Sequence, residues 1–240
     1  MSGTVSVAIY GVGGQINTLY LQLSSSVSNV FIPKVNRIVA ETGNNQELTE
    51  LFTKVGRIQF IIMSLILSGF IFFGKPFIYF WAGKEYSESY YIALLLIVPV
   101  TVPLIQNLGI EIQRAKNKHK ARSIVYLFIA VANIIISVPL IKIMGSIGAA
   151  LGTSISLIVG NIIFMNWYYQ KKLGINIKYF WMSIGRFFPA FIVPTIIGIF
   201  SMRVKYTNIA SLSMGIIGYT VVFSISMYFL GMNQEEKSMI

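Results

Sequence analysis

The amino-acid sequence predicts an all-α membrane protein, a polytopic bundle of about seven transmembrane helices that forms one domain over residues 1–240. The chain is 55% hydrophobic and only 11% charged, too few polar side chains to cover a soluble globule of this size. Its apolar stretches are long enough to cross a hydrocarbon core of about 30 Å. These stretches do not alternate apolar with polar residues as barrel strands do, so helices are expected to satisfy the backbone in lipid.

The expected helices follow these stretches in chain order. They are predicted at residues 5–32, 58–81, 90–110, 124–144, 147–168, 187–202 and 209–231. Between Lys34 and Arg57, apolar residues recur at helical spacing on both sides of a Gly43–Asn45 break. This pattern predicts two short amphipathic helices at the membrane surface. Small residues at the start of the fifth helix predict close packing against a neighbouring helix.

Charge predicts the orientation. Fourteen of the nineteen lysines and arginines lie after the first, third and fifth expected helices or in the tail. The positive-inside rule places these segments in the cytoplasm, the N-terminus outside and the C-terminus inside. The formal charge of +11 then indicates pairing with the anionic headgroups of membrane lipids, and no nucleic-acid partner is expected.

An external start and an odd number of helices suggest the later portion of a longer protein, whose missing N-terminal helices would be a partner of this chain. The alternative is a complete seven-helix protein with a short, uncharged N-terminus that crosses the membrane unaided.

Few residues could carry out catalysis. The chain has no cysteine, no metal-ligand spacing and one histidine, His119, which a run of lysines marks as a solvated loop residue rather than a catalyst. Glu111 could relay a proton or pair with Arg114 three residues later. We therefore expect no enzyme activity, no catalytic residue, no metal and no cofactor.

Polar side chains in the first expected helix form a candidate binding surface. Gln15, Gln22 and Asn29 recur every seven positions and project in roughly one direction. They could form interhelical hydrogen bonds, or they could line a water-filled cavity that accepts a hydroxyl-rich substrate.

In the third expected helix, Gln106 and Asn107 are further substrate-binding candidates. In the same helix, Pro99 and Pro103 each remove a backbone hydrogen bond, which produces either a fixed kink or a hinge.

Four segments resemble a known family. They are Val7–Tyr10 with Phe31–Pro33, the turn formed by Trp81, Gly83 and Tyr86, the stretch 133–141, and the small-residue group Gly145, Gly148, Ala149, Ala150 and Thr153. Together these segments resemble the Wzx-type O-antigen and capsule polysaccharide flippases. That family lies in the superfamily that also holds MATE drug exporters and the lipid II flippase MurJ.

The resemblance implies an incomplete MATE-like carrier fold, in which a second lobe would close a central cavity. It also implies that an undecaprenyl-diphosphate-linked oligosaccharide moves across the bacterial cytoplasmic membrane. Arg57 and Arg186 would then contact the headgroup, because the guanidinium fork donates two parallel hydrogen bonds to phosphate; snorkelling to ordinary lipid phosphates is the alternative. A MATE-like ion-coupled exporter of small molecules and a membrane-embedded glycan transferase or polymerase are alternative functions.

Overall fold

The computed structural model describes residues 3–238, and every regular element within them is a helix. Short 3-10 and π-helical turns join or extend the α-helices. The α-helices are α1 (Thr4–Asn29), α2 (Ile32–Glu41), α3 (Asn45–Trp81), α4 (Ser89–Ile105), α5 (Leu108–Ala115), α6 (Lys120–Leu157), α7 (Met165–Tyr168), α8 (Ile177–Gly185), α9 (Ile192–Ser201), α10 (Ile209–Ser226) and α11 (Gln234–Lys237).

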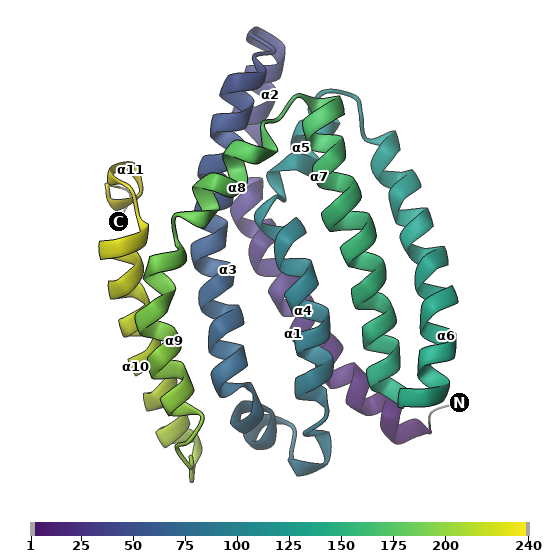
Figure 1. Cartoon of the computed structure of the whole chain (residues 1–240), viewed down its shortest axis with the longest axis vertical. Coiled ribbons are helices and arrows are strands. Elements are labelled where there is room, and N and C mark those ends of the chain that lie inside the picture. The colour runs from purple at the N-terminus through teal and green to yellow at the C-terminus, as the bar shows by residue number, and fades with distance from the viewer. Residues whose placement is uncertain (1–2, 239–240) are drawn as a thin grey trace.

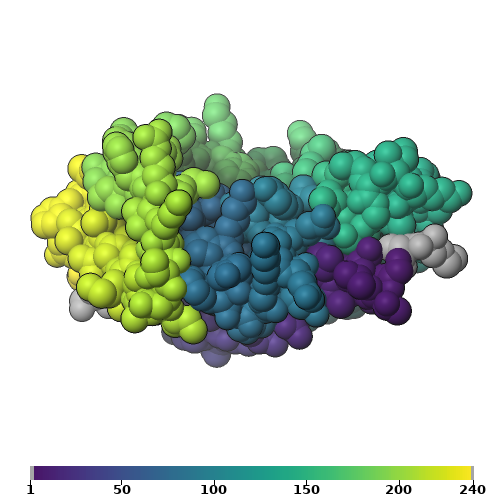
Figure 2. All heavy atoms as spheres, turned by 90° about the horizontal axis from the view of Figure 1, so that it is seen from below, coloured from purple at the N-terminus to yellow at the C-terminus, as the bar shows by residue number. Residues whose placement is uncertain are grey.

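The long helices run side by side, with α1 crossing obliquely behind α4 (Figure 1). Seen from below, the α6 hairpin and the α9–α10 pair lie at opposite sides of the molecule, with α3 and α4 between them (Figure 2). Apolar side chains on the outer surfaces of α6, α9 and α10 are exposed, as a lipid-facing surface requires; examples are Phe128, Ile134, Ile135, Phe200 and Ile217.

Within the described residues, four helical segments are long and apolar enough to cross a membrane. They are Asn45–Trp81, Lys120–Leu173, Ile177–Ser201 and Ile209–Gly231, and the bent pair α4–α5 makes a fifth. The chain is therefore a multi-pass membrane protein by the length and composition of its helices. The expected number of seven is not confirmed: Gln15, Asn17 and Gln22 lower the hydropathy of α1, and the helices expected at 124–144 and 147–168 lie within the one segment Lys120–Leu173.

The predicted start of the second long helix, residue 58, is wrong. Helix α3 begins at Asn45, where the Asn44 side chain accepts a hydrogen bond from the Gln46 N–H and caps the helix. The second expected surface helix is thus the first part of α3. A helix is confirmed at the position of the first expected surface helix, as α2, and the turn between α2 and α3 uses Gly43 at a φ of 59°.

Two other expected helices are bent or begin elsewhere. The segment 90–110 breaks between α4 and α5, which meet at 47° one turn after Pro103. The helix expected at 187–202 belongs to a longer segment, Ile177–Ser201, that is interrupted near Pro189. Arg186, expected in a connection, therefore lies at the end of α8.

The helices expected at 124–144 and 147–168 are the two arms of a hairpin that reverses at Gly145. This residue has φ 58° and ψ −132°, a conformation that side chains with a Cβ rarely adopt. A Cβ at Gly148 would meet the Leu140 carbonyl, and one at Gly152 would meet Ser137. The predicted close packing of the small residues is therefore confirmed.

Replacing Gly148 by alanine should push the two arms of the hairpin apart, because the added methyl group meets backbone rather than a movable side chain. We expect the variant to lose about 1–3 kcal/mol of unfolding free energy. Denaturation in mixed micelles, followed by circular dichroism, measures this loss. Gly218→Ala on α10 is the control, since open space surrounds its Cβ position; equal stability of the two variants would contradict the packing argument.

Candidate functional site

The basic connections meet at one end of the bundle, near α2, α5 and α8 in Figure 1. Lys116 Nζ donates to Asn45 Oδ1 at 2.6 Å and to the Leu173 carbonyl at 3.0 Å, and Lys118 Nζ donates to the Lys172 carbonyl at 2.6 Å. These ammonium groups neutralise the negative end of the helical segment that finishes at Leu173. Segments that the charge count assigned to one side of the membrane thus lie together.

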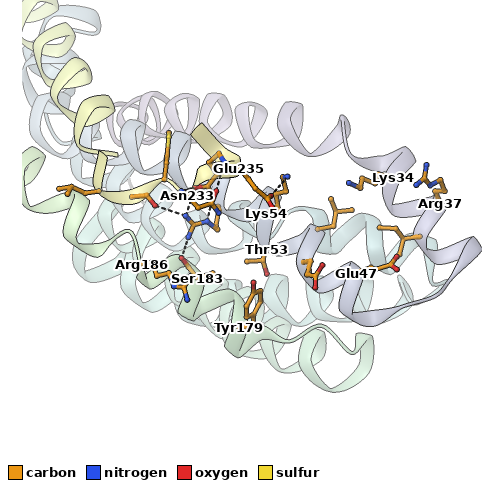
Figure 3. A pocket seen from close by; sticks show the side chains of 18 residues that line it. Lys34, Arg37, Glu47, Thr53, Lys54, Tyr179, Ser183, Arg186, Asn233 and Glu235 are labelled. Carbon is orange, nitrogen blue, oxygen red and sulfur yellow. Dashed lines mark hydrogen bonds and ion pairs between the residues drawn. The ribbon is translucent and has the colours of Figure 1, made fainter. Parts of the chain in front are cut away.

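At this end a cleft of about 740 Å³ opens between α2, the start of α3, α8 and the C-terminal residues (Figure 3). It brings together Arg57 and Arg186, the two arginines expected to contact a headgroup. Five cations and four carboxylates line it: Lys34, Arg37, Lys54, Arg57, Arg186, Glu47, Glu50, Glu235 and Glu236. The remaining candidates, on α1 and near the α4–α5 break, do not line this cleft.

Arg57 is buried, and protein acceptors occupy its guanidinium. Its Nε and Nη2 donate to the two carboxylate oxygens of Glu236, with the Nη2 bond at 2.8 Å. Its Nη1 donates to the Ser183 carbonyl, its Nη2 also reaches the Gly231 carbonyl at 3.1 Å, and the Phe187 ring lies 4.2 Å from its Cζ. In this arrangement Arg57 meets a phosphate only if Glu236 moves away.

Arg186 and Lys34 are exposed cations of the cleft that are not held in an ion pair with a carboxylate of residues 3–238, unlike Arg37, Lys54 and Arg57. The nearby Thr53 hydroxyl is buried in the cleft wall and has no hydrogen-bond partner in the same part of the chain. These groups could bind an incoming anion without breaking an existing ion pair.

A second ion pair crosses the cleft from Lys54 to Glu235 at 2.9 Å. The hydrogen bond from Lys54, together with the charge of its ammonium, holds the pKa of the Glu235 carboxyl below its ordinary value. This pair therefore contributes fully above the ordinary glutamate pKa and is lost as the pH falls through the lowered one. Because Glu235 is exposed to solvent, its contribution to stability is small.

Helix α1 divides its polar residues between two faces. Ser24 and Ser28 are buried, and Gln59 Nε2 donates to the Ser24 carbonyl at 3.0 Å and to Ser28 Oγ at 2.7 Å. Gln15, Gln22 and Asn29 instead are exposed on another face. The side chains of α1 that form hydrogen bonds with neighbouring helices are therefore Ser24, Ser28 and Tyr20, and the three amides form an outward polar row.

Gln106 and Asn107 lie at the break between α4 and α5. Gln106 is buried, and its Nε2 donates to Asn166 Oδ1 at 2.9 Å; Asn107 is half-buried. Pro99 and Pro103 lie in α4 just before this break. Gln106 and Asn107 therefore place two polar side chains at a bend inside the bundle.

The surroundings of Glu111 and His119 fit structural roles. Glu111 forms an ion pair with Arg114 at 2.9 Å, which is one of the two roles that the sequence suggested for it. His119 is exposed next to the start of α6. Residues 3–238 hold no group of three side chains that could bind a metal ion.

Comparison with family models, with curated proteins and with solved structures finds no match to this chain. Its function is therefore inferred from the arrangement of its residues.

The interaction that sequence analysis missed is the pairing of Arg57 with Glu236. The two residues are 179 positions apart, and Glu236 lies in a tail without apolar periodicity. The one available signal was Asn233 three residues before Glu236, a spacing typical of a capped helix start.

Arg57→Gln should destabilise the protein strongly, because it leaves the buried Glu236 carboxylate without its partner. We expect a loss of about 3–5 kcal/mol, the usual cost of breaking a buried ion pair from one side. Arg37→Gln removes an equal charge from an exposed pair with Glu41 and should cost about 0–1 kcal/mol. Unfolding in mixed micelles compares the two variants, and similar losses would refute a structural role for the buried pair.

Proposed function

We propose that this chain is part of a carrier that moves an undecaprenyl-diphosphate-linked oligosaccharide from the inner to the outer leaflet of a bacterial cytoplasmic membrane. The observation that carries the proposal is the outward polar row of Gln15, Gln22 and Asn29 on a helix packed into an otherwise lipid-facing bundle. Amides at membrane depth need water or a polar partner. A sugar chain supplies such partners, because each amide both donates to and accepts from hydroxyl groups.

The charged cleft supports the same proposal. A diphosphate needs cations, and Arg186 and Lys34 present accessible ones at the basic end of the bundle. The apolar tail of the carrier lipid can stay in the membrane while the headgroup enters the protein. This transport breaks no covalent bond, so the protein needs no general acid, base or metal, and we propose no enzyme activity.

The proposal includes a MATE-like arrangement with seven passes. Helix α1 would be one pass, and each arm of the Gly145 hairpin another. A second lobe, built from helices N-terminal to this chain, would face the polar row of α1 and close a cavity between the lobes. The N-terminus of this chain would lie outside and its C-terminus in the cytoplasm.

Replacing Gln15, Gln22 and Asn29 together by leucine should block transport in the organism that encodes the protein, because the substrate's sugars lose their hydrogen-bonding wall. We expect less surface polysaccharide and an accumulation of the lipid-linked oligosaccharide on the inner leaflet, at unchanged protein level. The control replaces the lipid-facing Ile134, Ile135 and Ile143 by leucine. Normal polysaccharide in the α1 variant would reject the proposed path, and altered drug resistance instead would favour a small-molecule exporter.

Single cysteines test the orientation directly, since the sequence contains none. Both Lys84, in the turn between α3 and α4, and Lys120, at the start of α6, are exposed. In Figure 1 the α3–α4 turn and the start of α6 lie at opposite ends of the bundle. In intact cells an impermeant maleimide should label Lys84→Cys and leave Lys120→Cys unlabelled until the membrane is opened. Labelling of Lys120→Cys from outside would invert the proposed topology.

A further inference from the structure

The C-terminal segment, Met232–Lys237, forms part of the wall of the charged cleft (Figure 3). Asn233 and Glu236 cap its short helix reciprocally: the Asn233 N–H donates to Glu236 Oε2 at 2.9 Å, and the Glu236 N–H donates to Asn233 Oδ1 at 2.8 Å. This capping box fixes the orientation of the Glu236 carboxylate. The segment therefore presents this carboxylate to α3 in a defined position.

The carboxylate contacts Arg57 in the manner of an oxyanion ligand. Its two oxygens accept from Nε and Nη2, the edge of a guanidinium that binds phosphate with two parallel hydrogen bonds. Lys54 lies one helical turn before Arg57 on α3 and binds Glu235, the neighbouring acid. Two adjacent carboxylates thus form ion pairs with two cations on one helix face. The two phosphoryl groups of a diphosphate could bind the same two cations.

Charge in the cleft depends strongly on this segment. Five cations and four carboxylates line the cleft, and two of the four carboxylates belong to the segment. With the segment undocked, five cations would face the two carboxylates of Glu47 and Glu50. The buried Thr53 hydroxyl, which has no partner among residues 3–238, is a further donor in the same wall.

We infer that the C-terminal segment is a displaceable internal occupant of a diphosphate site formed by Lys54, Arg57 and Arg186. Its Glu235 and Glu236 carboxylates hold the positions of the anionic oxygens until a diphosphate exchanges with them. Exchange is favoured over simple opening, because an unpaired buried Arg57 is costly whereas one anion can replace another. The identity of the diphosphate as part of a glycolipid rests on the proposed function. The diphosphate site and its occupation by the C-terminal segment do not rest on that function.

Binding of inorganic pyrophosphate to the full chain in detergent tests the inference. Glu236→Gln vacates the Arg57 edge, so the Kd for pyrophosphate should fall at least ten-fold and pyrophosphate should raise the unfolding temperature of the variant more than that of the wild type. Glu85→Gln removes the same charge at the opposite end of the bundle and should bind as the wild type does. The double variant Arg57→Gln/Glu236→Gln should lose the gain. Equal affinity in Glu236→Gln and Glu85→Gln, or a gain that persists in the double variant, would overturn the inference.

A cross-link keeps the test decisive even if Glu236→Gln does not fold. Because the natural chain has no cysteine, Lys54→Cys and Glu235→Cys can be joined by a reducible bis-methanethiosulfonate cross-linker, which spans the gap left by the two long side chains and pins the segment over Arg57. The cross-linked protein should bind pyrophosphate at least ten-fold more weakly than the same protein after reduction, and equal binding would exclude displacement. If pyrophosphate displaces the segment but the α1 triple variant makes normal surface polysaccharide, the diphosphate site is supported and the glycolipid carrier is rejected. If pyrophosphate does not displace the segment but the α1 triple variant loses surface polysaccharide, the carrier is supported and the displaceable segment is rejected.

Discussion

Lipid offers no hydrogen-bond partner, and this constraint determines how the polar groups of the bundle are arranged. Gln59 reaches across to α1 and bonds both a serine hydroxyl and a backbone carbonyl. Ser154 donates to the Leu95 carbonyl of α4, and Ser226 donates to the Ala190 carbonyl beside the interrupted α8–α9 segment. Hydroxyl groups thus connect neighbouring helices at several points in the bundle. The amides of Gln15, Gln22 and Asn29 take no part in these contacts and are exposed on another face of α1.

The breaks in the helices place the polar acceptors of the site. The π-helical end of α10, Met227–Gly231, leaves the Gly231 carbonyl free to accept from Arg57. The end of α8 does the same with the Ser183 carbonyl. Carbonyl groups left free by irregular backbone need other donors, and here one guanidinium serves two such carbonyls and a carboxylate. The buried arginine thereby holds α3, α8 and the end of the chain together.

Sequence reasoning found what local patterns encode. Apolar length predicted the helical membrane bundle, the small residues after Gly145 predicted close packing, and the spacing of seven placed three amides on one face. It missed the start of α3, because Glu47, Glu50, Lys54 and Arg57 hide the helix from a search for apolar length although Asn44 is a recognisable cap. It could not find the Arg57–Glu236 pair, since that contact depends on how distant helices pack. Which face of α1 points outward depends likewise on its packing against α4.

Helix α3 is much longer than the membrane is thick. Its 37 residues span about 55 Å at 1.5 Å per residue, against about 40–45 Å for a bilayer including its headgroups. A tilt of about 20° shortens this projection by only a few ångström. The surplus turns at the Asn45 end, before Lys54 and Arg57, would then extend beyond the headgroups of one leaflet. In the proposed carrier, the charged cleft beside Lys54 and Arg57 would lie at the level of the lipid headgroups, so that a diphosphate could enter it from within their layer.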